Sequence, residues 1–423
     1  MANDAYSCAS GGAIRAGWYS GLAGNLVVAG DSLTDIGFTG GMGGYGWGLA
    51  LARSGVLVGY NAGVAGNQIA NLWSRWSADV AGHAPVAVMT RIGTNNVDGN
   101  STTNIAAFTA DYQPILDWHV SNAVPGVIHA IPPESGTSGA AILARNAWLA
   151  AQCAAHPGLL YFADDSIDLG DGAYAYQPQY YADGTHMGPW GKRKQGERMA
   201  PVLQAIFGQR ESRLLDPADQ YANNAASNQY VANAHMAGSA GTTGSGVTGT
   251  VPTGWTVACS GGASAVASIV AADIGDALAV PWLRITPSAA AGGEYVRVSQ
   301  VLTHPAFAGT LASLKRLDLV AEVRFNGLDA SKFTELASGV CSFTNGGLFP
   351  SRIHQLHLGY GQTLNDTVIV RQGLQRDQGG FALQSIPANG LRVQFDLTAA
   401  AGGYGASPGS IDIRCVSVRG RTD

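Results

Sequence analysis

Charged side chains are scarce in this sequence of 423 residues. They make up 13% of it, against about 25% in average soluble proteins, and the formal net charge is −5. No long basic run is present that could neutralise the phosphates of a nucleic acid. An acidic tail and a polybasic membrane-binding patch are also missing. We therefore expect no nucleic-acid partner.

Long apolar runs are missing too. No stretch of about 20 apolar residues could span a bilayer, so no membrane insertion is expected. The N-terminal sequence MANDAYSCASGGAIRAGWYSG does not combine a basic region with an apolar one, as a secretory signal does. We predict a soluble protein. If it acts outside a cell, its export uses another route or its signal has been removed.

Cysteine is rare and dispersed. The five cysteines form no C-x-x-C pair, so the sequence does not predict a zinc site. Their odd number leaves at least one thiol free, and we interpret them mostly as small buried hydrophobic residues. A disulfide between two of the three in the C-terminal half stays open. The five are Cys8, Cys153, Cys259, Cys341 and Cys415.

One segment, ADDSIDLGDGAYAYQ, carries four aspartates: Asp164, Asp165, Asp168 and Asp171. Clustered carboxylates could supply the oxygen ligands of a calcium ion. A solvated acidic loop is the favoured interpretation, and we expect neither a metal nor an organic cofactor.

The length predicts two domains, and the sequence pattern changes near residue 209. We expect an N-terminal extension at 1–24, an α/β domain at 25–209 and an all-β domain at 210–423. In the α/β domain, short apolar runs alternate with helical patterns, which predicts a parallel sheet between two layers of helices. Strands are expected at Leu26–Ala29, Val56–Tyr60, Val86–Arg91, Val127–Ile131 and Leu159–Phe162. Helices are expected around Trp47–Arg53, Ile69–Val80, Ile105–Asn122, Ser138–His156 and Lys192–Phe207.

Apolar and polar residues alternate through much of the second domain. This period of two, with turn residues between the runs, predicts an antiparallel sandwich, and seven or eight strands fit a jelly roll. The tract from Gly238 to Trp255, GSAGTTGSGVTGTVPTGW, is expected to be a loop rather than a linker if the strands on each side belong together. The expected strands are WLRITP, EYVRVSQVL, LDLVAEVRF, QLHLGY, TVIVRQ, LRVQFDLT and SIDIRCVSV.

Two glycine motifs match known patterns but lack the context. GMGGYG, Gly41 to Gly46, fits G-x-G-x-x-G but is not set directly between a strand and a helix, and no acidic residue stands about 20 positions on. GASPG, Gly405 to Gly409, fits G-x-S-x-G, but strands flank it and no histidine follows it. We reject both as sites.

The stretch VVAGDSLTDIG places Ser32 directly after the first predicted strand, where a serine is common. The segment YYADGTHMGPWGKRKQG places Asp183 and His186 three residues apart, between the last strand and the last helix of the same domain. A serine hydrolase needs a base for the hydroxyl and a carboxylate to orient that base. Because loops after parallel strands meet at one edge of the sheet, we expect these three residues to come together.

Two more loops follow predicted strands. NAGVAGN contains Gly66, whose backbone N–H could approach a substrate oxygen without a side chain in the way, and RIGTNN contains Asn95, whose amide could face an oxyanion. The alternatives are a turn that merely needs a positive φ at Gly66 and a turn asparagine that caps the next helix at Asn95. Four such loops in order at one edge favour the catalytic interpretation.

The blocks GDSLTD, AGVAGN, GTNN and DGTH, in this order, resemble those of the SGNH (GDSL-like) hydrolase family. The resemblance covers residues 25–207, and the IPP segment is also similar to a loop of the family. It implies a flavodoxin-like domain. Asn96 departs from the aspartate that the family often has there, which affects only the local turn. By this resemblance Ser32 is the nucleophile, Asp183 and His186 complete the triad, and Ser32, Gly66 and Asn95 form the oxyanion hole.

The resemblance implies ester hydrolysis through an acyl-enzyme, without a cofactor. The C-terminal pattern is similar to carbohydrate-binding-module jelly rolls, so we expect an acetylated polysaccharide or glycan as substrate and an extracellular or virion-associated protein, for example on a bacteriophage tail. The sandwich could instead form a homo-oligomer interface. Alternatives are a general carboxylesterase or lipase and a non-catalytic glycan-binding structural protein. Aromatic residues of the loops are candidate sugar contacts: Tyr45, Trp47 and Trp190.

Overall fold

The computed structural model divides into two compact units, Met1–Gln209 and Arg210–Asp423, which are described separately. The expected extension at 1–24 lies outside the described residues, as does Ser407 of the rejected GASPG motif. The described residues are 26–35, 43–53, 58–96, 105–172, 174–208, 230–276, 279–303, 316–342, 355–375, 391–405 and 408–421. None of the helices in these ranges is long and apolar enough to cross a membrane.

The N-terminal unit is built on a five-stranded parallel sheet with the order β2-β1-β3-β4-β5. Most residues of these strands are buried, as expected for a parallel sheet covered on both faces. The predicted strands are confirmed, and their ends differ from the predicted ones by at most three residues. They are β1 Leu26–Gly30, β2 Val58–Gly63, β3 Ala87–Arg91, β4 Gly126–His129 and β5 Leu160–Ala163.

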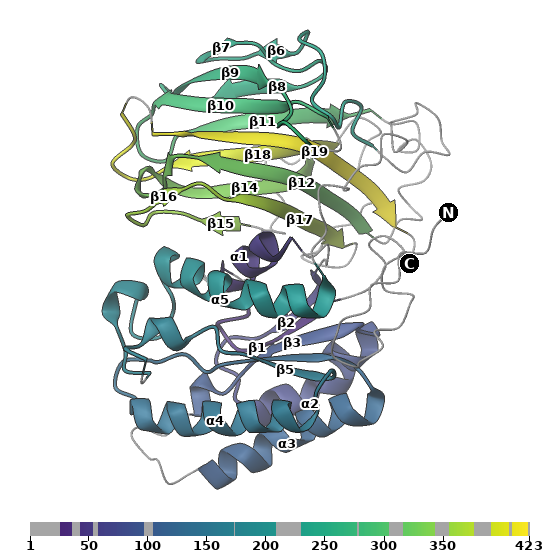
Figure 1. Cartoon of the computed structure of the whole chain (residues 1–423), viewed down its shortest axis with the longest axis vertical. Coiled ribbons are helices and arrows are strands. Elements are labelled where there is room, and N and C mark those ends of the chain that lie inside the picture. The colour runs from purple at the N-terminus through teal and green to yellow at the C-terminus, as the bar shows by residue number, and fades with distance from the viewer. Residues whose placement is uncertain are drawn as a thin grey trace. The chain divides into compact units, whose positions relative to one another are not determined.

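Helices cover both faces of this sheet, so the predicted three-layer flavodoxin-like arrangement is confirmed. Helices α1 and α5 lie together on one face, and α2, α3 and α4 lie on the other (Figure 1). Helix α1 begins four residues before the expected start and packs closely on α5. The helices are α1 Gly43–Ala52, α2 Ile69–Asp79, α3 Ile105–Asn122, α4 Gly139–Ala155 and α5 Pro189–Phe207.

Glycines allow the close approach of α1 and α5. A Cβ atom on Gly196 would lie 2.3 Å from the Cβ atom of Trp47, and one on Gly48 would lie 2.5 Å from the Sδ atom of Met199. Both distances are too short for real side chains, so glycine is required at the two positions. The contact fixes Trp47 inside the helix interface.

From β1 the chain first adds β2 on one side of the sheet and then β3, β4 and β5 on the other, so the order of strand addition reverses between β1 and β3. In open parallel sheets of this kind the loops after the two strands at such a switch point border a crevice, where ligands usually bind. Ser32 follows β1 and Asn95 follows β3. The fold thus brings two of the predicted site residues to the position where the topology favours a site.

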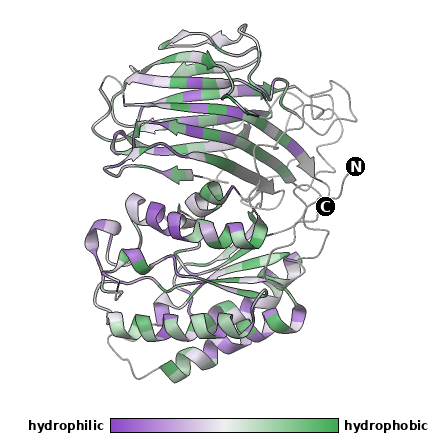
Figure 2. Cartoon of the chain, in the orientation of Figure 1, coloured by the Kyte–Doolittle hydropathy of each residue, from purple (hydrophilic) through white to green (hydrophobic). Residues whose placement is uncertain are grey.

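The C-terminal unit is a sandwich of two six-stranded sheets, and hydrophobic and hydrophilic residues alternate along its strands (Figure 2). Strand pairs are antiparallel except for β6 with β8 and β7 with β9. The first sheet contains, in order, β17 Thr367–Gln375, β12 Arg316–Asn326, β19 Ser410–Arg421, β10 Trp282–Ala289, β9 Ser264–Val270 and β7 Val247–Gly249. The second contains β15 Gln355–His357, β14 Phe333–Ser342, β18 Leu391–Ala399, β11 Tyr295–Leu302, β8 Thr256–Cys259 and β6 Thr242–Thr243.

The all-β sandwich is confirmed, but the described strands outnumber the seven or eight expected for a jelly roll. All seven predicted segments contain strands, while β8, β9, β14 and the two-residue strands β13 Leu328–Asp329 and β16 Thr363–Leu364 were missed. The Gly238–Trp255 tract, expected to be a loop, contains the short strands β6 and β7. Small residues dominate β8 and β9, so their apolar alternation is weak in the sequence.

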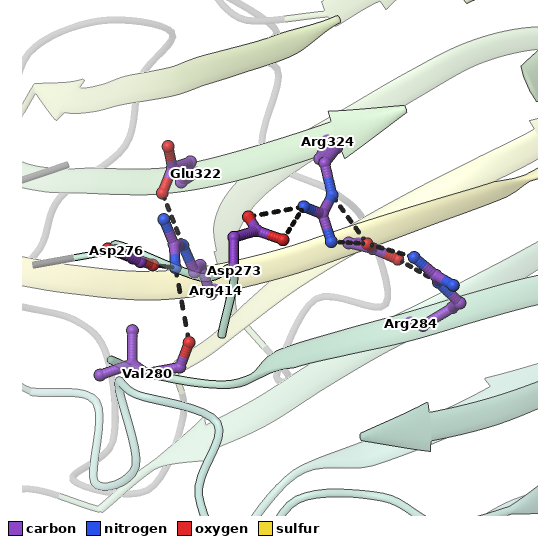
Figure 3. A network of polar contacts seen from close by, with 8 residues as sticks. Asp273, Asp276, Val280, Arg284, Glu322, Arg324 and Arg414 are labelled. Atoms are coloured by element: carbon purple, nitrogen blue, oxygen red, sulfur yellow. Dashed lines mark hydrogen bonds and ion pairs between the residues drawn. The ribbon is translucent and has the colours of Figure 1, made fainter. Parts of the chain in front are cut away.

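Arginine–carboxylate pairs cross one face of the first sheet (Figure 3). The side chain of Asp412 accepts hydrogen bonds from Arg284 at 2.7 and 2.9 Å and from Arg324 at 2.9 and 2.6 Å. Arg324 also contacts both carboxylate oxygens of Asp273, at 2.8 and 2.7 Å. The pairs connect β10, β12 and β19 with the segment that precedes β10.

Arg414 is the centre of a second group of contacts on the same face (Figure 3). It donates to the Oε2 atom of Glu322 at 2.7 Å and to a carboxylate oxygen of Asp276. The guanidinium groups of Arg414 and Arg324 lie 3.9 and 4.3 Å from the ring centroid of Trp282, within the range of cation–π contacts. Charges and an aromatic ring thereby hold the segment before β10 against the sheet.

The cysteines whose side chains are described are buried and free: Cys153, Cys259 and Cys415. Each possible pair among the three cysteines of the C-terminal half includes Cys259 or Cys415, so the structure contains no disulfide between them. Burial raises the pKa of the Cys259 thiol to about 11, as expected for a small hydrophobic residue. Cys8 lies outside the described residues.

Candidate active site

Ser32 lies in a tight turn directly after β1. The turn closes through hydrogen bonds from the N–H groups of Thr34 and Asp35 to the carbonyl oxygen of Asp31, at 3.0 and 2.9 Å. Gly30 precedes it because a Cβ atom there would lie 2.0 Å from the carbonyl oxygen of Arg91 on β3. The strand therefore ends close against its neighbour, and Ser32 is 7% exposed.

Asp183 and His186 form a compact turn before α5. One carboxylate oxygen of Asp183 accepts the N–H groups of Thr185 and His186 at 2.8 and 2.7 Å, and the other lies 2.9 Å from the Nδ1 atom of His186. The Nε2 atom of the same ring lies 2.9 Å from the Oγ atom of Ser32. The contacts assign the Nδ1–H tautomer, which leaves Nε2 to accept the serine proton.

The carboxylate of Asp183 is ionised over the whole physiological range. The small burial of this side chain raises its pKa, but hydrogen bonds from the His186 and Thr185 N–H groups and from the His186 ring outweigh burial and lower the pKa to about 2. The side chain is 57% exposed. An anion therefore faces the Nδ1–H of the histidine, where it stabilises the imidazolium that forms during proton transfer.

Neighbouring loops hold the histidine turn in place. The N–H of Ser135, in the loop after β4, donates to the carbonyl oxygen of Gly184 at 2.8 Å, and the hydroxyl of Tyr176 donates to the carbonyl oxygen of Asp183 at 3.1 Å. The hydroxyl of Thr185 lies 3.5 Å from Glu134. Sequence reasoning did not assign Glu134 or Ser135 a role. The IPP segment just before them was the available signal.

Gly66 occupies a left-handed backbone conformation, with φ of +77°, in the exposed loop after β2. No heavy atom lies within 4 Å of the place where a Cβ would be, so the backbone conformation and not crowding explains the glycine. This loop contacts the serine turn: the N–H of Ala65 donates to the carboxylate of Asp35 at 2.9 Å. The left-handed conformation of Gly66 fits both alternatives, an oxyanion donor and a plain turn, and so does not decide between them.

Asn95 is exposed, and its Nδ2 atom donates to the carbonyl oxygen of Asn67 at 2.9 Å. The capping role considered for Asn95 belongs to its neighbour, because the Oδ1 atom of Asn96 accepts the N–H of Ile69 at the start of α2, at 2.9 Å. The capped helix is the preceding one and not the next one in the chain. Asn95 thus remains available as an oxyanion donor beside the loop of Gly66.

Asp31, which precedes Ser32, is fully buried. One of its carboxylate oxygens accepts the N–H of Leu33 at 3.0 Å, while the other has no hydrogen-bond partner among the described residues. Burial raises the pKa of Asp31 to about 7, although Leu33 and the positive charge of Arg91 act in the opposite direction. The carboxylate beside the Nδ1 atom of His186 is that of Asp183, and its orienting role stays a prediction.

A buried polar cluster lies behind the serine turn. The guanidinium of Arg91 donates to the carboxylate of Asp165 and, at 3.0 Å, to Gln195, while the Nδ1 atom of His129 lies 3.0 Å from Asp165. Burial lowers the pKa of His129 despite this carboxylate. The interpretation of the acidic segment as a solvated loop is therefore wrong for Asp165, which has no exposed surface.

Two aspartates of the acidic segment contact other side chains of the N-terminal unit. Asp168 pairs with Arg198 at 2.7 and 2.8 Å, and Asp164 accepts the hydroxyl of Tyr174. Across the described ranges, no group of three or more histidine, cysteine, aspartate and glutamate side chains is placed to hold a metal ion.

The predicted sugar contacts Tyr45 and Trp47 are wrong, because both side chains have 0% exposure. The hydroxyl of Tyr45 lies 3.2 Å from the Oγ1 atom of Thr34, and the ring of Trp47 lies under the guanidinium of Arg193 at 4.4 Å. These aromatic residues build the α1–α5 layer and do not face a ligand. Trp190 is half-buried, with its ring 4.8 Å from that of Tyr180, and its role stays a prediction.

The geometry suits acyl transfer. A nucleophile, a base within hydrogen-bond reach and an ionised orienting group lie in line, and the loops with Gly66 and Asn95 border the same strand ends. Proton transfer from Ser32 to His186 needs no rearrangement of the side chains.

Residues 28–194 match the model of the GDSL-like Lipase/Acylhydrolase family. No curated protein matches the chain.

Solved structures resemble the chain over less than half of its length. A protein of Desulfitobacterium hafniense DCB-2, named as a lipolytic protein of the G-D-S-L family, is 20% identical, with 42% of this chain and 98% of that one covered and a TM-score of 0.35. An acetyl esterase mutant with an acetate ion is 19% identical, with coverage of 44% and 98% and a TM-score of 0.36. A catalytic mutant of an acetylxylan esterase from Geobacillus stearothermophilus is 17% identical, with coverage of 45% and 96% and a TM-score of 0.34.

The family match includes all four predicted blocks in full, from GDSLTD, which begins at Gly30, through DGTH, which ends at His186. It ends within α5, the last helix of the N-terminal unit. Over residues 28–194, within the N-terminal unit, the chain therefore matches the GDSL-like Lipase/Acylhydrolase family.

Proposed function

We propose that this ester hydrolase removes acetyl groups from a carbohydrate, with Ser32 as nucleophile. The observation that carries the catalytic part is the line of contacts from Asp183 through His186 to Ser32, each at 2.9 Å. His186 takes the Ser32 proton as Oγ attacks the ester carbonyl carbon, and a tetrahedral intermediate forms. His186 then gives the proton to the leaving alcohol, and the acyl group stays on Ser32.

The second half of the reaction reverses these roles. Water loses a proton to His186 and attacks the acyl-enzyme, and His186 returns the proton to Ser32 as the carboxylic acid leaves. The N–H groups of Ser32 and Gly66 and the amide of Asn95 are the proposed donors to the oxyanion in both halves.

The exposed residues near the serine turn support a small acyl group. The loop after β2 exposes Val64, Ala65 and Gly66, so a single branched apolar side chain accompanies two small residues there. A long acyl chain would need a continuous apolar surface to cover it. The all-β second unit supports a polymeric substrate by analogy of architecture with esterases that carry such a module. An extracellular or virion-associated location belongs to the same proposal.

The test is a series of p-nitrophenyl esters with two to twelve acyl carbons, followed by acetate release from an O-acetylated polysaccharide. We expect the highest kcat/KM for acetate, acetate release from the polymer, and loss of both activities in the Ser32→Ala variant. A preference for long chains would identify a lipase or general carboxylesterase. Absence of turnover on every ester in the folded protein would support a glycan-binding structural protein.

A further inference from the structure

Arg75, in helix α2, contacts two of the segments that carry the proposed site residues. Its Nη2 atom donates to the carbonyl oxygen of Gly30 at 3.2 Å, at the end of β1 and two residues before Ser32. Its Nε atom donates to the Oδ1 atom of Asn67 at 2.9 Å, next to Gly66. One guanidinium therefore bridges the strand end before the nucleophile and the loop after β2.

Asn67 extends this bridge to the third loop. Its side chain accepts from Arg75, while its main-chain carbonyl oxygen accepts the Nδ2 atom of Asn95 at 2.9 Å. A side-chain amide nitrogen has two hydrogens. The contact with Asn67 uses one of them, fixes the plane of the amide and leaves the other hydrogen for an oxyanion.

The guanidinium is itself held in place. Its Nη1 atom donates to the carboxylate of Asp79, one helical turn further on, at 2.8 Å. The carbonyl oxygen of Gly30 also accepts the N–H of Val64 at 3.1 Å, which holds the loop to the strand end from its other side. Only a planar group with several fixed donors can satisfy Gly30, Asn67 and Asp79 together, and a lysine ammonium does not have this geometry.

We propose that Arg75 is a positioning residue of the oxyanion hole: through Asn67 it fixes the Gly66 N–H and the Asn95 amide relative to Ser32. The inference rests on the proposed function. Oxyanion donors interact more strongly with the transition state than with the ester, so a displaced donor lowers kcat and leaves KM nearly unchanged.

The test measures kcat and KM for p-nitrophenyl acetate in the Arg75→Ala, Arg75→Lys and Asn67→Ala variants. Each substitution removes the hydrogen bond between Arg75 and Asn67. Each is expected to lower kcat roughly tenfold, with KM within about twofold of the original value. Arg198→Ala is the matched control, because Arg198 also pairs with an aspartate but contacts none of the three loops. It is expected to keep the full kcat.

A double-mutant cycle separates positioning from general loss of structure. If Arg75 acts through the oxyanion donors, Arg75→Ala costs less in an Asn95→Ala background than in the original protein, since one of the donors is already gone. If the fold loss in kcat of the double variant equals the product of the losses in the two single variants, the proposal is overturned. Circular dichroism identifies any variant that fails to fold, and Asn67→Ala then decides in place of Arg75→Ala.

The outcome also distinguishes this inference from the function on which it rests. Turnover that persists in Ser32→Ala would show that the proposed function is wrong. An inactive Ser32→Ala variant, together with unchanged kcat in Arg75→Ala and Asn67→Ala, would overturn the positioning role alone.

Discussion

The Nε2 atom of His186 lies 2.9 Å from the Oγ atom of Ser32, although 154 residues separate them along the chain. The distance is short because Ser32 follows the central strand β1, while His186 lies in a turn that a loop after β4 holds in place through Ser135. Both segments emerge at the carboxyl edge of the parallel sheet. The active site therefore depends on the whole sheet and on no single stretch of sequence.

Replacing the nucleophile tests the site most directly. Ser32→Ala is expected to abolish hydrolysis of p-nitrophenyl acetate and to leave the circular-dichroism spectrum and melting temperature nearly unchanged, because a small side chain replaces another. Ser74→Ala is the control, since among the described residues that hydroxyl donates to the Asn71 carbonyl oxygen on α2, away from the site. Residual turnover equal to that of the original protein would remove Ser32 from the mechanism.

The carboxylate of Asp183 should matter equally across a wide pH range. Its pKa of about 2 keeps it ionised from pH 5 to pH 9. Asp183→Asn is therefore expected to lower kcat by on the order of 10²–10⁴ at every pH in this interval, since imidazolium formation loses its anionic partner. Steady-state kinetics at pH 5, 7 and 9 measures this, and a loss confined to one end of the range would contradict it.

The amide of Asn95 is expected to act on the transition state. Asn95→Ala should lower kcat by about 10²–10³ with little change in KM. Asn96→Ala is the matched control: it removes the acceptor of the Ile69 N–H in the first turn of α2, whose N-cap is Gln68, and is expected to cost about 1 kcal/mol of stability and far less activity than Asn95→Ala. Equal kcat losses in the two variants would mean that both residues only shape the loop.

Asp31 should make the protein less stable as the pH rises. The unfolded chain releases this proton near 3.8 and the folded chain near 7, so between these values the folded state binds more protons. Raising the pH through this window therefore favours unfolding, by up to on the order of 4 kcal/mol for this group.

The Asp31→Asn variant keeps an oxygen acceptor for the Leu33 N–H and removes the titration. Its stability relative to the original protein, measured by urea unfolding, is expected to increase between pH 5 and pH 8. The same difference at both pH values would show that burial does not hold the proton on Asp31.

The ion pairs of the C-terminal sandwich predict a large effect on stability. Arg414→Leu leaves the buried carboxylate of Glu322 without its arginine, and removing one partner of a buried pair typically costs about 3–5 kcal/mol. Arg198→Ala, which breaks an exposed pair with Asp168, should cost less than about 1 kcal/mol. Urea unfolding followed by tryptophan fluorescence compares them. Equal costs would contradict the burial argument.

Much of the N-terminal unit could be predicted because its signals are local. Apolar runs of parallel strands and the four short blocks at their ends are visible without knowledge of the packing. Which aromatic residues face a ligand depends on the packing itself. Tyr45 and Trp47 follow the first block, yet both are buried, Trp47 in the close contact of α1 with Gly196 on α5 and Tyr45 beside Thr34.

Strand β14 was also missed because of a feature of the packing that the sequence does not reveal. Its pairing with β18 shifts register between Phe333 and Glu335, so the buried residues Phe333 and Leu336 do not follow a period of two. A bulge of this kind breaks the alternation on which strand prediction depends. The contacts of Arg75 were also invisible, because they join residues 8 and 45 positions away.

The turn from Asp183 to His186 closes its internal hydrogen bonds within four residues, and a single side-chain contact connects it to Ser32. The base and its carboxylate thus form one local structural unit. The number of residues between Ser32 and this unit can vary, as long as the sheet presents both at the same edge. Insertions in the loops at the opposite edge of the sheet, away from the loops of Gly66, Asn95 and Ser135, should therefore be tolerated by the catalytic geometry.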